Sequence, residues 1–195
     1  MKNLMLVFVL LVSGIGFGQG NPAKMRLPQQ GSYHMDHEDF ENLNSWIVKE
    51  LNGDSLSQEV FKIFNEYRLY VGLSELEFDT TLQKAADIQA RYCLSIHEST
   101  HIQNNNVKLK TPPMRLNSVD PKGIIDFKAE IASKNDYMFT ITTKRTLTQY
   151  VLDLFYLSKS HRNIIESSES TKIGISIYKG VEFDSRFYVV AVFGK

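Results

Sequence analysis

The sequence predicts an α+β fold, with helices in its first part and β-strands at its end. Apolar residues recur at helical spacing through much of residues 38–97, whereas two β-rich runs close the chain at 172–178 and 186–193. This order lacks the repeated strand–helix alternation of a parallel α/β sheet. Turn-forming and charged residues separate the two final runs, so we expect them to pair as neighbouring antiparallel strands.

Residues 1–19 are predicted to be a signal peptide. Lys2 supplies a positive start, residues 4–12 an apolar core, and residues 14–19 a small-residue exit. The apolar run is too short to span a bilayer, so we expect no transmembrane segment in the mature chain. No cysteine lies near the predicted cleavage site, which argues against a bacterial lipid anchor. We therefore expect a secreted or periplasmic protein.

The composition of the chain indicates one exported domain. About 175 residues remain after the signal, enough for a substantial core. Loss of Lys2 with the signal leaves 21 basic against 22 acidic residues, a net charge of −1. No cluster of Lys or Arg points to a nucleic acid as a partner. We also expect the protein to be a monomer. Cys93 is the single cysteine, so no intramolecular disulfide can form.

Two segments precede the main body of the domain. Residues 20–37 carry Gly, Pro and Gln without hydrophobic periodicity, which predicts a flexible leader. Residues 38–56 are predicted to be an added N-terminal helical extension, because apolar side chains recur there at helical spacing. Asn52-Gly53 is a plausible end for that helix.

Two further helices follow the extension. Ser55-Leu56-Ser57-Gln58 has the form of a capping box and opens a helix that Gly72 ends. After a short bridge at 73–78, Asp79 can cap the next helix. The apolar face of the first comprises Val60, Phe64, Tyr67 and Val71, and one stripe of the second comprises Leu82, Ala86, Gln89, Cys93 and His97.

Residues 102–127 are predicted to be a long polar connection, and such connections in compact domains are usually functional or mobile. A fourth helix begins near Thr143. Residues 158–166 form a turn or a short helix. The apolar face of the fourth helix comprises Leu147, Tyr150, Val151 and Leu154.

The segment His97-Glu98-Ser99-Thr100-His101 matches the H-E-x-x-H signature of zinc proteases. In those enzymes both histidines bind one Zn²⁺ from a continuous helix, the glutamate activates water, and a third ligand comes from elsewhere. Glu130 is the candidate third ligand here. Asn104-Asn105-Asn106, however, indicates that the helix ends near His101, which does not suit the motif.

From Val60 to Phe193 the chain resembles the CAP family, which includes cysteine-rich secretory proteins, venom antigens, plant pathogenesis-related proteins and many bacterial members. The likeness lies in an N-x-x-R pattern at Asn65 and Arg68, a D-x-x-L pattern with paired alanines within 79–90, and a histidine at position 101. It continues through Ser158-Lys159-Ser160-His161-Arg162-Asn163, Lys172-Ile173-Gly174-Ile175 and Val192-Phe193-Gly194.

The resemblance implies a fold and a site. The fold is a three-layer α-β-α sandwich with a mostly antiparallel sheet, formed by a CAP domain at 57–195. The site is a cleft in which His101 and His161 match the two family histidines. Glu130 matches the family glutamate, and Ser158 stands at a second acidic position. The chain departs from the family pattern at Phe155, where a Trp is usual, and at Ser160, where a Gly is usual.

Two imidazoles and a carboxylate favour a divalent-metal site, so the resemblance implies that His101, His161 and Glu130 could bind Zn²⁺. Ser158 could orient an imidazole or a bound water. On this interpretation the H-E-x-x-H match is coincidental, and His97 is a half-buried helix histidine. We expect an extracellular module that binds a metal, a small lipid-like ligand or an extracellular partner. The alternative is a zinc-dependent hydrolase or protease, and no catalytic residue is assigned. Convergence of His101 with His161 favours the module, and convergence of His97 with His101 favours the protease.

Overall fold

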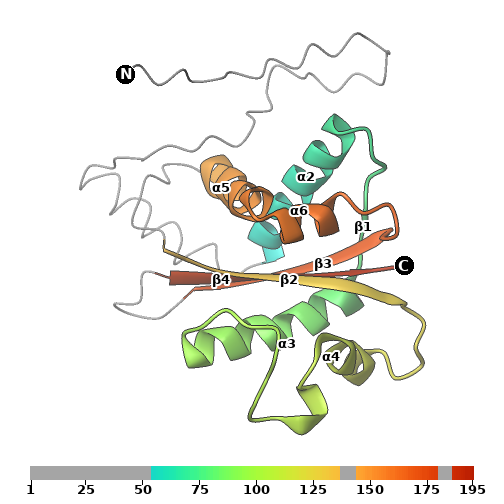
Figure 1. Cartoon of the computed structure of the whole chain (residues 1–195), viewed down its shortest axis with the longest axis vertical. Coiled ribbons are helices and arrows are strands. Elements are labelled where there is room, and N and C mark those ends of the chain that lie inside the picture. Colours follow the sequence, from blue (N-terminus) through green and yellow to red (C-terminus); the bar gives the residue numbers. More distant parts are fainter. Residues whose placement is uncertain (1–53, 137–143, 180–185) are drawn as a thin grey trace, which may run out of the picture.

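The computed structural model describes residues 54–136, 144–179 and 186–195. Within these ranges, two layers of helices enclose one β-sheet (Figure 1). Helices α2, α5 and α6 cover one face of the sheet, and α3 and α4 cover the other. The predicted α-β-α sandwich is therefore confirmed. The predicted signal peptide, the leader and most of the N-terminal extension lie outside the described residues.

The helices and strands of the described ranges follow one another along the chain in this order. Their bounds are α2 (Asp54–Tyr70), β1 (Glu77–Phe78), α3 (Thr80–Ile96), the 3₁₀-helix η2 (Val107–Leu109), α4 (Pro112–Val119), β2 (Phe127–Asp136), α5 (Lys144–Leu157), α6 (Lys159–Ile165), β3 (Lys172–Lys179) and β4 (Arg186–Gly194).

The four strands lie in the order β1-β3-β4-β2. Strand β1 pairs with β3 in parallel, and the other two pairings are antiparallel, which confirms both the mostly antiparallel sheet and the predicted C-terminal pair. Every residue of β4 from Phe187 to Gly194 is buried. Because side chains alternate along a strand, successive residues of β4 serve opposite faces of the sheet: Val189 belongs to one core cluster and Val190 to the other.

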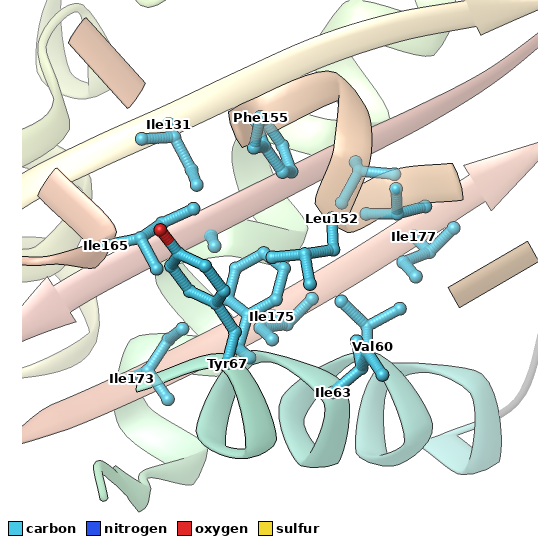
Figure 2. Close-up of a cluster of buried hydrophobic side chains, with 14 of the residues drawn as sticks. Val60, Ile63, Tyr67, Ile131, Leu152, Phe155, Ile165, Ile173, Ile175 and Ile177 are labelled. Atoms are coloured by element: carbon cyan, nitrogen blue, oxygen red, sulfur yellow. The ribbon is translucent and has the colours of Figure 1, made fainter. Parts of the chain in front are cut away.

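The larger core lies between the sheet and the layer of α2, α5 and α6 (Figure 2). Val60, Ile63 and Tyr67 project from α2 toward isoleucines of β3, while Phe155 enters from α5. The rings of Phe64 and Phe155 meet edge to face at 6.0 Å, an arrangement that aromatic pairs prefer. The apolar residues that recur at helical spacing in α2 thus form its buried face.

The N-x-x-R pattern of α2 fastens this helix to two loops. Asn65 copies a backbone hydrogen-bond pair: its Nδ2 donates to Leu76 O at 3.0 Å, and its Oδ1 accepts from Leu76 N at 2.9 Å. The fully buried Arg68 donates through Nε to Ser74 O and through Nη1 to Ile165 O and Ser167 O. The two side chains therefore tie α2 to the segment before β1 and to the end of α6.

Helix α3 packs closely on the other face of the sheet. Asp79 caps it as predicted, since its Oδ1 accepts from Thr81 N at 2.8 Å and from Leu82 N at 3.0 Å. The backbone of α3 passes so near β3 that a Cβ on Gly174 would lie 1.9 Å from Gln83 N. Glycine is therefore required at this contact. The same close approach explains why three buried residues of α3 are small: Ala85, Ala86 and Ala90.

Two predicted helix faces differ from the structure. Val71 lies beyond the end of α2 and is exposed, because the chain turns at Gly72, whose φ is +81°. In α5 the buried positions include Thr148, Leu152 and Phe155 besides the predicted Val151, whereas Tyr150 and Leu154 are only partly buried. The side chain of Leu147 lies outside the described residues.

Several short elements and one strand were not predicted. Helix α4 and the 3₁₀-helix η2 interrupt the long polar connection, and β2 follows it as the strand that pairs with the whole of β4. The short bridge at 73–78 also contributes β1. In the described ranges, no helix is both long and apolar enough to cross a membrane.

Candidate functional site

Helix α3 ends before the H-E-x-x-H segment begins. Its last residue is Ile96, and His97 takes the left-handed conformation (φ 56°) that closes a helix. The following Glu98 N donates to Cys93 O at 3.1 Å, which completes this helix end. His97 is exposed, so the prediction of a half-buried helix histidine is wrong on both points. The two histidines of the motif therefore do not share a continuous helix.

The carboxylate of Glu98 forms an ion pair with a lysine, which is not the environment of a protease base. Its Oε2 lies 3.0 Å from Nζ of Lys134 on β2, in an exposed ion pair. The same ammonium donates to His97 O at 3.2 Å. Because a zinc protease needs both histidines one helical turn apart on a continuous helix, this segment lacks the protease geometry.

Buried amides hold the backbone around His101. Gln89 of α3 donates to Thr100 O, and its Oε1 accepts from Gln103 Nε2 at 3.1 Å. Gln103 N in turn donates to Lys110 O at 3.0 Å. Both glutamine side chains belong to buried residues. The position of His101 is therefore fixed on each side, although it lies in no helix or strand.

The ring of His101 contacts a carboxylate from β2. Its Nδ1 lies 2.9 Å from Oε1 of Glu130. The imidazole is 45% exposed, whereas the Glu130 side chain is 1% exposed. A buried carboxylate therefore orients an imidazole whose far side reaches solvent. Two of the predicted site residues, 29 positions apart, are thus brought together.

Glu130 has a second partner, Arg115 of α4. Arg115 Nη2 donates to both carboxylate oxygens, at 2.8 Å to Oε1 and 2.7 Å to Oε2. The Arg115 side chain is fully buried, so this charge pair is shielded from water. A permanent cation therefore neutralises Glu130 inside the protein.

His161 lies on α6. Its ring meets Phe155 edge to face at 5.3 Å. Burial lowers the pKa of His161, and its electrostatic interaction with His101 lowers it further. We call His101, Glu130 and His161 together the His101–His161 site.

Ser158 takes the N-cap position of α6, next to this site in sequence. Its Oγ lies 3.0 Å from Ser160 Oγ. That contact supports the turn into α6, and a role toward an imidazole or a bound water stays a prediction.

The fit of these residues to a metal ion is partial. Imidazole nitrogens suit Zn²⁺, and a carboxylate bonded to Nδ1 is a usual partner of a metal-binding histidine. Glu130 itself is committed to Arg115 and His101 through both oxygens. In the described part of the chain, no three His, Cys, Asp or Glu side chains come together as a metal-binding group. The residues fit a two-histidine site in which Glu130 orients a ligand better than a set of three protein ligands.

Arg115 is the site residue that sequence reasoning missed. The signal for its helix was present, because Thr111-Pro112-Pro113 places proline at the first helical positions. Nothing in the local pattern indicated that the arginine would be buried, since arginine is usually exposed.

Comparison with known proteins identifies the family of this chain. The family model described as "CAP: Cysteine-rich secretory protein family" matches residues 61–193. The chain belongs to the CAP family. The match covers His101, Glu130, Ser158 and His161, and it reaches from α2 to β4.

Solved structures share this CAP fold. An outer surface protein from Borrelia burgdorferi is 21% identical, with a TM-score of 0.53, and the alignment covers 85% of this chain and 98% of that one. An extracellular protein containing an SCP domain from Bacillus anthracis is 19% identical, with a TM-score of 0.50 over 73% of this chain. This CAP chain spans 41% of the length of that protein. Among curated proteins, none matches the chain.

Proposed function

We propose that this CAP protein is an exported binding module whose His101–His161 site takes a divalent transition metal such as Zn²⁺. The observation that carries the proposal is the 2.9 Å contact between His101 Nδ1 and the buried Glu130. A carboxylate that orients an imidazole in this way is the usual outer partner of a metal-binding histidine.

The chemistry of both rings supports this choice of metal. Metal binding requires a neutral imidazole, and the lowered pKa of His161 keeps that ring neutral at neutral pH. Hard cations such as Ca²⁺ and Mg²⁺ prefer carboxylate oxygens, but both oxygens of Glu130 already accept hydrogen bonds from Arg115. The remaining coordination positions would accept water or a donor atom of a small extracellular ligand.

Export is supported by the first 19 residues, which have the charged start, apolar core and small-residue exit of a signal peptide. It also agrees with the extracellular and outer-surface descriptions of the two similar bacterial structures. A lipid-like ligand stays a prediction. The protease alternative loses its support because α3 ends at Ile96, ahead of both motif histidines.

Calorimetric titration with Zn²⁺ tests the site. We expect His161→Ala and His101→Ala to abolish zinc binding, because each removes one of two imidazole ligands. His97→Ala is the matched control: it removes an exposed histidine of the same segment and should leave the affinity unchanged. Loss of binding in His97→Ala with retention in His161→Ala would reject the site, and so would the absence of zinc affinity in the unmutated protein.

A further inference from the structure

We propose that Arg115 is a positioning residue of the His101–His161 site: acting through Glu130, it fixes the ring proton of His101 on Nδ1 and leaves Nε2 as the atom that meets a ligand. The placement of the proton can be measured in the metal-free protein. Only the consequence for metal affinity rests on the proposed function.

The first step concerns charge. The guanidinium of Arg115 is permanently protonated, and its Nη2 donates to both oxygens of Glu130 at 2.8 Å and 2.7 Å. Both side chains are at most 1% exposed, so water does not weaken the pair. The pair fixes the direction in which the Glu130 carboxylate faces. An ionised carboxylate can only accept hydrogen bonds.

The second step concerns the proton on the ring. Nδ1 of His101 lies 2.9 Å from Oε1 of Glu130, so one of the two atoms must donate. Because the carboxylate cannot, the hydrogen belongs to Nδ1. A neutral imidazole carries one ring hydrogen, and Nε2 therefore keeps its lone pair.

The third step concerns the backbone. The same Nη2 of Arg115 also donates to His101 O at 3.1 Å, and Nη1 donates to Leu109 O at 3.0 Å and Lys110 O at 3.3 Å. Arg115 thus holds the main chain of His101 and the partner of its ring together. One side chain therefore contributes both to the location of this imidazole and to the orientation of the carboxylate that contacts its ring.

A purely structural role explains the arrangement less well. Arg115 Nε is buried and has no hydrogen-bond partner within the described residues, which costs free energy. Buried charge pairs are often no more stabilising than apolar side chains of similar volume. The combined contacts of Arg115 with Glu130 and His101 therefore favour a role in placing the site.

The test is the tautomer of His101, read from ¹⁵N NMR of metal-free protein at about pH 8.5, where an ordinary histidine is neutral. We expect the hydrogen on Nδ1 in the unmutated protein. In Arg115→Met, Glu130 and the main chain of His101 lose the side chain that holds them, so the contact at Nδ1 is no longer fixed and a mixture of the two tautomers is expected. Arg115→Lys keeps the charge but loses the two-oxygen contact, so a smaller shift toward the Nε2 tautomer is expected.

Arg68→Met is the matched control. Among the described residues, Arg68 is a second fully buried arginine, and its guanidinium donates there to the backbone carbonyls of Ser74, Ile165 and Ser167. Its loss should reduce stability without changing the tautomer of His101. A change of tautomer in Arg68→Met as large as in Arg115→Met would overturn the proposal.

Two other results would also overturn it: a hydrogen on Nε2 in the unmutated protein, or one that stays on Nδ1 in Arg115→Met. The measurement on the unmutated protein decides the matter even if Arg115→Met does not fold. Zinc affinity is read separately, with a loss of about 10- to 100-fold expected in Arg115→Met. Nδ1 protonation without zinc binding in the unmutated protein would reject the proposed function and leave the role of Arg115 intact.

Discussion

His101 and His161 are chemically the same residue, yet their surroundings differ. The ring of His101 is 45% exposed and contacts a carboxylate. The ring of His161 is partly buried against Phe155, and burial, followed by the effect of His101, lowers its pKa. Protonation of His161 would place a positive charge in a partly buried environment.

The pKa of His161 should therefore lie below the ordinary histidine value of about 6.5. An NMR titration of the ring carbon protons in metal-free protein measures it. In His101→Gln the neighbouring charge is lost while burial remains, so the pKa of His161 should rise part of the way toward 6.5. A value at or above 6.5 in the unmutated protein would contradict the described environment.

The same shift affects stability. Above about pH 6.5 His161 is neutral in both states and contributes no pH dependence. As the pH falls through about 6.5, the unfolded chain takes up a proton that the folded chain binds less readily, so the free energy of unfolding decreases. We expect His161→Gln to lose this part of the acid sensitivity in urea unfolding measured between about pH 7.5 and 5. An unchanged slope would show that His161 does not contribute.

The sequence identified three residues of the site but not Arg115, the residue that holds two of them in place. His101, Glu130 and His161 were recognised because they stand in motifs of the CAP family. Arg115 was not recognised, because its burial depends on the packing of α4 over β2, and no local sequence pattern indicates that packing. The assigned role of Glu130 also shifts from ligand toward orienting group, since the arginine that occupies it was unforeseen.

Among the helices and strands, prediction succeeded where periodicity is strong. Helices α2, α3 and α5 and strands β3 and β4 all show regular apolar spacing or runs of β-branched residues. Strand β2 lacks both. It contains Lys, Ala, Glu, Asn and Asp, which are poor strand formers in isolation. Pairing with β4 along nearly its full length makes it a strand, a tertiary effect that its own residues do not reveal.

The contact of α3 with β3 yields a prediction about Gly174. In Gly174→Ala the new methyl group would lie 1.9 Å from Gln83 N, so α3 must move away from the sheet. We expect a loss of about 1–3 kcal/mol or more in the free energy of unfolding measured with urea. Gly72→Ala is the comparison, because its Cβ would meet nothing within 4 Å and only the backbone strain at φ +81° remains. Equal losses in the two variants would contradict the close packing.

For the molecule as a whole, the sheet joins two cores. Side chains of β4 alternate between the cluster under α2, α5 and α6 and the cluster under α3 and α4. Both helical layers therefore depend on this one strand for their packing. The described body of the protein should unfold as a single cooperative unit.

Val189→Ala and Val190→Ala test this cooperativity, since the two neighbours belong to opposite cores. Each removes two buried methyl groups, and we expect a loss of about 1–3 kcal/mol in either case. Circular dichroism and tyrosine fluorescence should report one coincident transition in both variants. Val107→Ala, at a position that is 79% exposed, should stay within about 0.5 kcal/mol. Separate transitions for the two signals would show that the layers are independent.

Because β4 is enclosed, its position in the fold restricts which residues can vary in sequence and contact other molecules. No molecule from the medium can reach a residue between Phe187 and Gly194, since helices or neighbouring strands occupy every side. Any ligand can therefore contact only residues outside this part of β4, such as His101 and His161 of the proposed site. Those surface residues can change by mutation while the inner strand keeps the shape of the whole.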